Sequence, residues 1–164
     1  MLKSSLKVKK SKELSLTKEG RVVAENIAYR HNLSEYFLCN TLGIPWYEVH
    51  QHAHLLEHAM TPLVVEKLAE FLDNPKFCPH GTPMPGSALP KNTISLMETE
   101  PGMMVEIAMI GEVLEDSVDL MKILHEHRIM PGNQHKVVDK TEVMRTVLLE
   151  SKDGPSTLPF HVAE

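Results

Sequence analysis

The stretch from Asn74 to Asn92 constrains the fold more than any other part of the sequence. It holds five prolines, and proline fixes its own φ and lacks the N–H that a helix or a central strand would use. A long helix or a central strand therefore cannot cross this stretch. We expect it to be a linker or an ordered irregular loop that joins two differently built halves.

The half before these prolines has the apolar spacing of helices. Thr17 is suited to cap a first helix, and Gly43 is suited to end a second. Pro45 and Pro62 each stand where the first turn of a helix tolerates proline. The pattern predicts helices over residues 17–31, 33–42, 46–60 and 61–72.

The half after the prolines mixes strands with one helix. Residues 103–110 are mostly apolar, which is typical of a buried strand. Helical spacing follows over 117–127, and two further strands are predicted at 135–138 and 143–149. Near the N-terminus, alternation over 6–16 predicts a short two-stranded ribbon. The expected fold class is α+β, with a helical unit followed by a small β-barrel-like module.

The charge of the chain is unevenly distributed. Its net charge of −5 argues against a general nucleic-acid binder. Basic residues nevertheless concentrate near the N-terminus. Their side chains are expected either to contact nucleic-acid phosphates or to be exposed to solvent at the end of the chain. The lysines of the predicted ribbon that would contact DNA are Lys7, Lys9, Lys10 and Lys12.

The sequence carries no sign of a membrane or of export. No apolar run approaches the roughly 18 residues of a membrane span, and no apolar signal-peptide core follows Met1. Cys39 and Cys78 are too far apart in the sequence to suggest a disulfide framework. We therefore expect a cytoplasmic protein without a membrane partner.

A His/Glu cluster on the predicted helix over 46–60 carries the clearest chemistry. An apolar stripe that begins at Val49 faces the core, and four polar side chains lie beside it within about two turns. A further pair, His31 and Glu35, has the i, i+4 spacing that shares one helix face. Imidazole and carboxylate together bind divalent ions such as Mn, Fe, Co, Ni or Zn. The four side chains on the flank are His50, His54, Glu57 and His58.

Two other interpretations of these residues stay open. The histidines can be ordinary surface or hydrogen-bonded core residues, although so many at ligand spacing favour a metal site. A small metalloenzyme is the chemical rival, but the chain lacks H-E-x-x-H, G-x-S-x-G and a glycine-rich phosphate loop, so we do not expect an enzyme. Cys78 and His80 could lend a ligand, but such a pair in a proline-rich loop is more often structural.

The order of the motifs resembles the iron- and manganese-dependent repressors of the DtxR/MntR type. The segments that carry the resemblance are Leu16–Arg21, Arg30–Glu35 and Val49–Met60, followed by Phe77–Pro85 in the proline-rich stretch. Residues from about Ser95 onward are similar to the family's SH3-like (FeoA-like) domain. The resemblance implies the sensing and dimerising portion of a metal-dependent transcriptional regulator.

The resemblance also implies two metal sites. The SH3-like domain of the family can add two polar ligands three residues apart, and Asp116 and Asp119 are the matching pair here. The family usually has Cys or Glu where this chain has His54, so Mn or Fe is expected while Zn, Co and Ni stay open. The implied primary site is His54, Glu57 and His58, and the implied ancillary site is His31, Glu35 and His50.

The resemblance divides the chain into three parts. These are a remnant wing over 1–17, a helical metal-binding and dimerisation domain with its proline-rich connector over 18–90, and the SH3-like domain over 91–164. Family members begin with a winged helix-turn-helix, so we expect this chain to be truncated there, without the recognition helix. The implied partners are a second copy of the chain and, in full-length relatives, operator DNA. The alternative is a metal-binding dimer that does not bind DNA.

Overall fold

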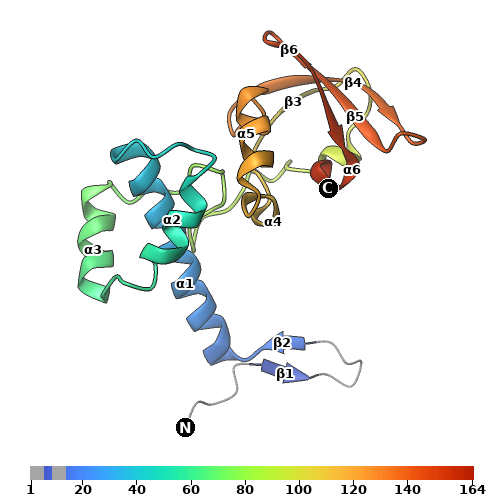
Figure 1. Cartoon of the computed structure of the whole chain (residues 1–164). Coiled ribbons are helices and arrows are strands. Elements are labelled where there is room, and N and C mark those ends of the chain that lie inside the picture. Colours follow the sequence, from blue (N-terminus) through green and yellow to red (C-terminus); the bar gives the residue numbers. More distant parts are fainter. Residues whose placement is uncertain (1–5, 9–13) are drawn as a thin grey trace.

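The computed structural model describes residues 6–8 and 14–164 (Figure 1). Its first elements are strands β1 (Leu6–Val8) and β2 (Leu14–Leu16), which pair antiparallel. The predicted ribbon is therefore confirmed, and it lies at the N-terminal end of the first helix. Of the four lysines predicted to contact DNA, Lys7 belongs to β1, whereas Lys9, Lys10 and Lys12 lie outside the described residues.

Helix α1 (Lys18–Tyr36) begins where the sequence predicts, with the Thr17 side chain capping its first turn. The predicted break near residue 32 is wrong, because one continuous helix spans both predicted helices. Asn32 favours a helix interior only weakly, but its Nδ2 donates to Pro83 O at 3.3 Å. This tertiary contact stabilises Asn32 within the helix, although asparagine by itself favours a helix end. The helix passes into a π-helical turn, Phe37–Thr41.

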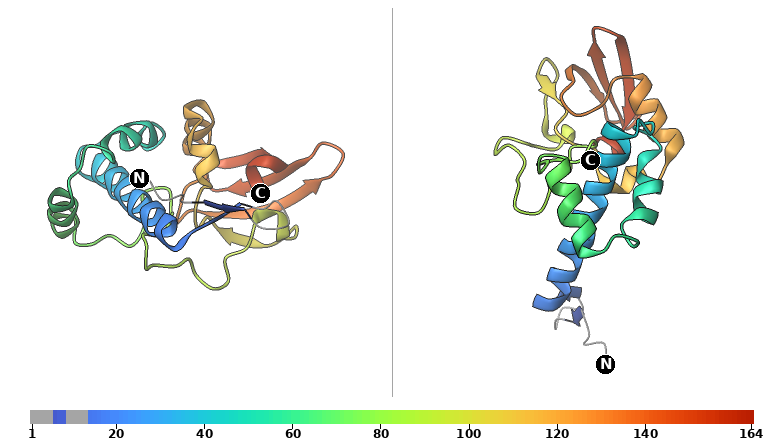
Figure 2. Two further views of the ribbon diagram at one scale, coloured as in Figure 1. Left: turned by 90° about the horizontal axis from the view of Figure 1, so that it is seen from below. Right: turned by 90° about the vertical axis from the view of Figure 1, so that its left-hand side faces the viewer.

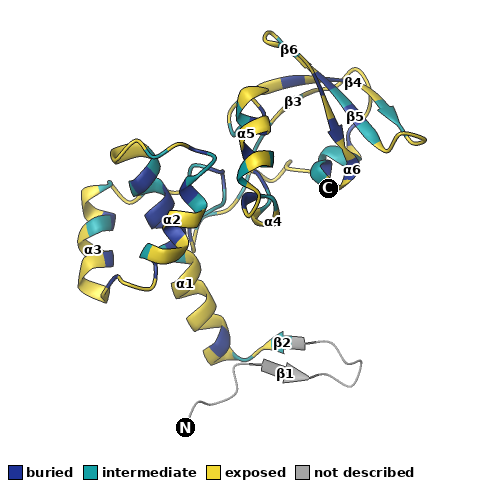
Figure 3. Ribbon diagram, in the orientation of Figure 1, coloured by how far each residue is buried: buried dark blue, intermediate teal, exposed yellow. Residues whose placement is uncertain are grey.

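Helices α2 (Val49–Leu56) and α3 (Pro62–Phe71) pack against α1. The predicted bounds are too wide for α2, because residues 46–48 and 57–59 form turns. In Figure 3 the buried surfaces of the three helices face one another. Their apolar contacts form two small clusters, which are Leu33, Met60, Val65 and Ala69, and Leu38, Val49 and Ala53.

The half after the prolines is built on an antiparallel sheet in the order β3-β4-β5-β6. The strand predicted over 103–110 is too long, because only 104–106 pair with the next strand and residues 107–110 are not part of it. The last strand was not predicted, although Gly154 opens it after a tight turn at φ +116°. The elements are η2 (Leu96–Glu98), β3 (Met104–Glu106), α4 (Glu112–Glu115), α5 (Val118–Glu126), β4 (Gln134–Thr141), β5 (Thr146–Ser151), β6 (Gly154–Pro159) and α6 (Phe160–Ala163).

The predicted fold class is confirmed, since a helical unit is followed by a small antiparallel sheet. Figures 1 and 2 show α1, α2 and α3 at one end and the sheet at the other, with α4 and α5 between them. Within the described residues, no helix has both the length and the apolar character that crossing a membrane requires.

The proline-rich connector is an ordered loop that joins the two halves. Trp46 Nε1 donates to Pro79 O at 2.9 Å, and His80 Nε2 donates to Trp46 O at 2.9 Å. On the other side, Ile110 N donates to His80 O at 2.8 Å. Trp46 comes from the helical half, yet its ring belongs to the apolar core of the other half, with Ile110, Met121, Leu124 and Phe160 among its members.

Replacing Gly81 with alanine should destabilise this junction. Gly81 has φ +88°, and a Cβ added there would lie 2.2 Å from Ala108 O. Gly86→Ala is the matched control, because its φ is +93° and an added Cβ meets no atom within 4 Å. We expect the control to lose about 1–2 kcal/mol of unfolding free energy from its backbone conformation, and Gly81→Ala about 1–3 kcal/mol more from the clash. Equal losses in urea unfolding would contradict the close approach.

Candidate metal centre

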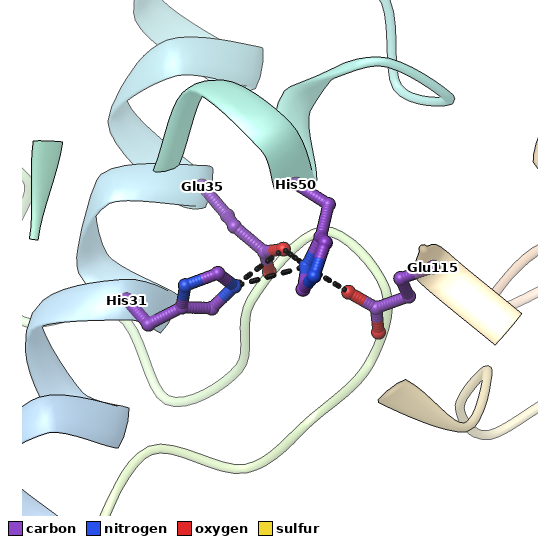
Figure 4. Close-up of side chains that lie close together, drawn as sticks. All are labelled: His31, Glu35, His50 and Glu115. Atoms are coloured by element: carbon purple, nitrogen blue, oxygen red, sulfur yellow. Dashed lines mark hydrogen bonds and ion pairs between the residues drawn. The ribbon is translucent and has the colours of Figure 1, made fainter. Parts of the chain in front are cut away.

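Four separate segments bring metal-binding side chains together at the junction between the two halves. We call Glu35, His50, Cys78, His80 and Glu115 the inner cluster. These residues come from α1, α2, the connector and α4 (Figure 4 draws three of them with His31). The outer cluster is His54, Glu57 and His58, at and just after the end of α2.

Glu35 lies at the centre of the inner cluster and is 1% exposed. Its Oε1 is 3.1 Å from His50 Nδ1, 3.1 Å from His31 Nε2 and 3.3 Å from His80 Nδ1. Its Oε2 has no hydrogen-bond partner among the described residues. A buried carboxylate with an unpaired oxygen is costly unless a cation can reach it.

Glu115 brings a second buried carboxylate from α4. Its Oε2 lies 3.0 Å from His50 Nδ1 and 2.8 Å from His80 Nδ1. The His80 contact is short, but Nδ1 forms no well-directed hydrogen bond with any described residue. Since His80 Nε2 donates to Trp46 O, its Nδ1 is the nitrogen left for an ion. The donors in the inner cluster therefore fit a divalent cation.

The thiol of Cys78 adds a softer donor to the same place. Its Sγ lies within 4.8 Å of donor atoms of Glu35 and His80, and all three residues are buried. Burial raises the pKa of this thiol. A bound cation would remove its proton, because a coordinating thiol binds as the thiolate.

The outer cluster surrounds a single buried carboxylate, Glu57. Its Oε1 lies 3.1 Å from His58 Nε2 and 3.5 Å from His54 Nδ1, and its Oε2 lies 2.7 Å from His31 Nδ1. Glu57 is 3% exposed, whereas the His54 and His58 side chains are about two-thirds exposed. A cleft of about 660 Å³ between α1 and the connector reaches this cluster. An ion can therefore enter it from solvent.

The charges of the inner cluster are strongly coupled. Burial alone would raise the pKa of Glu35, but three neighbouring imidazoles hold that pKa well below its usual range. The Glu115 and Glu35 carboxylates raise the pKa of His50 to about 10. Burial disfavours the charged form of His80, but the neighbouring thiol and carboxylates raise its pKa to about 12. Protons on the imidazoles thus provide the positive charge that a cation would otherwise supply.

The structure brings most of the sequence-predicted ligands together. His31, Glu35 and His50 meet in one group, and His54 and His58 both approach Glu57. Asp116 Oδ1 lies 3.6 Å from His50 Nε2, and its side chain is 82% exposed. Asp119 is exposed and belongs to none of the donor groups that the described residues form.

Sequence reasoning missed Glu115 and undervalued two other donors. Glu115 directly precedes Asp116, and nothing in the sequence tells which of these two carboxylates turns inward. The sequence favours a structural role for Cys78 and His80, because no other metal-binding side chain lies close to this Cys-x-His pair along the chain. The signal that could have found them is the Cys-x-His spacing itself, which sets a thiol and an imidazole two residues apart in the loop that joins the two halves.

Several known proteins are similar to this chain in sequence or in fold. Residues 17–86 match the family model described as iron dependent repressor, metal binding and dimerisation domain. The iron-dependent repressor IdeR of Mycobacterium leprae is 29% identical over 170 residues, which cover 96% of this chain and 74% of that protein. The structure of the manganese regulator SloR has a TM-score of 0.80 at 26% identity, covering 97% of this chain and 74% of SloR. The structure of ScaR with bound Zn²⁺ has a TM-score of 0.81 at 26% identity, covering 97% of this chain and 79% of ScaR.

The helical unit and the small sheet together match the fold of a manganese regulator, and the described residues of this fold include groups of His, Glu and Cys side chains that could hold a metal ion. Residues 17–86 thus match the metal-binding and dimerisation domain of the iron-dependent repressors, and the chain as a whole is similar in sequence and fold to iron- and manganese-dependent repressors. The resemblance drawn from the motifs is thereby confirmed. The relatives are transcriptional repressors by name, and the match over 17–86 is to their metal-binding and dimerisation domain.

Metal binding to the inner cluster should release protons. The raised pKa values of His50 and His80 mean that both imidazoles hold protons near neutral pH, so an ion must displace them. We expect the apparent Mn²⁺ affinity to rise from about pH 6 to about pH 8, by about tenfold per pH unit for each proton displaced. Calorimetry in buffers of different ionisation enthalpy measures this release, and His80→Gln should release fewer protons. A binding enthalpy that is the same in every buffer would contradict this view of the cluster.

Proposed function

We propose that this chain is the sensing and dimerising portion of a transcriptional regulator whose DNA binding is gated by a divalent metal ion. The observation that carries the proposal is the pair of His/carboxylate clusters at the junction between the helices and α4. An ion in the inner cluster would link α1, α2, the connector and α4. Metal binding would then stabilise the form of the regulator that binds DNA over the form that does not, which is a population shift.

We propose the following ligands. The inner ion would use Glu35, His50, His80 and Glu115, with Cys78 as a fifth donor. The outer ion would use His54, Glu57 and His58, together with His31 from α1. Carboxylate oxygens suit Mn²⁺, whereas imidazole and thiolate donors also suit Fe²⁺ and Zn²⁺. Mn or Fe agrees with the metals in the names of the relatives, and Co and Ni fit the same donors.

The domain limits and the DNA contacts rest on the family comparison. We propose a wing over 1–17, a helical domain with its connector over 18–90 and an SH3-like domain over 91–164. Trp46 is the exception to this division, because it packs in the core of the C-terminal part. The lysines proposed to contact phosphates are Lys7, Lys9, Lys10 and Lys12.

Glu57→Ala should abolish metal binding at the outer cluster. The substitution removes the carboxylate that all three neighbouring imidazoles approach, so calorimetry with Mn²⁺ should show one binding event fewer. We also expect it to abolish metal-dependent binding to duplexes that the unaltered chain selects from a random library with Mn²⁺. His52→Ala is the control, because His52 is exposed on α2, one turn or so before Glu57, and belongs to no donor group of the described residues.

The two measurements separate the two functions. Unchanged Mn²⁺ binding in Glu57→Ala would remove the outer site from the proposal. Metal binding without any enrichment of DNA by the unaltered chain would instead favour a metal-binding dimer that does not bind DNA. Enrichment that EDTA reverses would support the regulator.

We further propose that the chain forms a homodimer through the outer face of α2 and α3. Leu63 and Phe71 on α3 are 64% and 69% exposed, and Leu55 at the end of α2 is 75% exposed. Apolar side chains gathered on one face mark an interaction surface in soluble proteins. The matched family model is a dimerisation domain, so a second copy is the expected partner.

Phe71→Glu should therefore shift the chain toward monomer, because it places a charge in the proposed interface. Sedimentation equilibrium at several protein concentrations measures the dissociation constant. Val143→Glu is the control, since Val143 is 94% exposed in the turn between β4 and β5, far along the chain from α3. A weakened dimer in the control but not in Phe71→Glu would place the interface elsewhere.

A further inference from the structure

Trp46 is a side chain of the helical half that completes the core of the C-terminal half. It lies in the turn before α2 and is 6% exposed. Its ring belongs to the apolar cluster that contains Met121 and Leu124 of α5. Tyr47 packs against the same cluster, and its ring centroid lies 5.5 Å from that of His125 on α5. The C-terminal core therefore depends on residues from the other half of the chain.

The same tryptophan also holds the turn that carries Cys78 and His80. Trp46 Nε1 donates to Pro79 O at 2.9 Å, and Trp46 O accepts a hydrogen bond from His80 Nε2 at 2.9 Å. The two rings lie with their centroids 4.7 Å apart at an interplanar angle of 76°. The turn itself is closed, because Cys78 N donates to Thr82 O at 2.9 Å. Trp46 thus contacts a short, well-defined turn through its ring and its backbone.

These contacts decide which nitrogen of His80 faces the inner cluster. Since Nε2 is bonded to Trp46 O, Nδ1 lies toward the two carboxylates, 3.3 Å from Glu35 Oε1 and 2.8 Å from Glu115 Oε2. On the other side of the turn, Ile110 N donates to His80 O at 2.8 Å. The hydrogen bond made by one ring nitrogen commonly orients the other toward a metal.

Trp46 also relates the position of Glu115 to that of His80. Leu114, the residue of α4 directly before Glu115, packs against the core that contains the Trp46 ring. The ring therefore lies in the core on which α4 rests, while its N–H holds the turn that carries His80. One side chain fixes two ligands that come from different segments.

We propose that Trp46 is a positioning residue of the inner cluster, which holds the turn over 78–82 so that His80 and Glu115 reach the same ion. This inference rests on the proposed function. Apolar burial is not directional, so packing of the ring does not by itself orient the turn. The hydrogen bond from Nε1 to Pro79 O is directional and does so. Replacing such a partner of a metal-binding histidine typically weakens metal binding by about 10–100-fold.

The test separates positioning from packing, with Co²⁺ as the probe of the full chain. Trp46→Phe keeps an aromatic ring in the core but cannot donate to Pro79 O. We expect the affinity of the inner cluster for Co²⁺ to fall about tenfold or more, as measured by a thiolate-to-cobalt charge-transfer band through Cys78. Calorimetry measures the outer ion, whose affinity should change by less than about twofold.

Leu149→Ala is the control for a loss of core packing. Leu149 is fully buried on β5 and belongs to the same core as Trp46. Its truncation leaves a cavity, so the midpoint of urea unfolding should fall more than in Trp46→Phe. The inner Co²⁺ affinity should nevertheless stay within about twofold of the unaltered chain.

Two further measurements show how Trp46 acts. In the His80→Ala background, Trp46→Phe should change inner binding by less than about twofold, because its effect passes through His80. In the metal-free chain, hydrogen exchange at Ile110 N–H reports the hold on the turn, since this group donates to His80 O. Trp46→Phe should speed this exchange by about tenfold, and Leu149→Ala should speed it less.

Three results would overturn the role of Trp46, and they are distinguishable. If Trp46→Phe leaves inner binding unchanged, or Leu149→Ala weakens it as much, Trp46 only fills the core. If Trp46→Phe weakens inner binding by the same factor in the His80→Ala background, it acts through another residue. Both outcomes leave the proposed function intact. If the unaltered chain gives no charge-transfer band with Co²⁺, the inner site of the proposed function fails, and the positioning role fails with it.

Discussion

Glu35 is a carboxylate that folding places in the interior, and the arrangement around it follows from the need to satisfy its charge. Its side chain is 1% exposed, and three imidazoles from three different segments converge on one of its oxygens. A buried charge is tolerated only when it is paired and hydrogen-bonded. Side chains from α1, α2 and the connector therefore meet at Glu35. Glu115 of α4 joins them through its contacts with His50 and His80.

The junction that surrounds Glu35 is held by contacts that need no metal. Trp46 packs into the core of the C-terminal half, and the backbone N–H of Ile110 donates a hydrogen bond to the carbonyl oxygen of His80. Because these contacts fix the position of α4, Glu115 stands close to His50 and His80 in the protein alone. An ion would then meet donors that are already in place, which lowers the ordering cost of binding.

The sequence predicted the fold class well and some boundaries poorly. The helical period, the caps at Thr17 and Thr61 and the prolines after Asn74 all act locally, so they are readable from the chain. The break predicted near Asn32 was wrong because a contact with Pro83, 51 residues away, outweighs a weak local propensity. The strand β6 was missed because its pattern of buried residues, Ser156 and Leu158, becomes apparent only against β5.

The sequence by itself determined which residues could be ligands on each helix. The period of 3.6 residues sets His31 beside Glu35 on α1. The same period, applied to the predicted helix over 46–60, groups His54 with Glu57 and His58, although the latter two lie in the turn that follows α2. Only the tertiary structure decided how the helices share these donors. It turned Glu115 rather than Asp116 inward, added Cys78 and His80 from a loop, and set His31 between the two clusters. Spacing along one helix is a local property, whereas contact between segments depends on how their apolar faces pack.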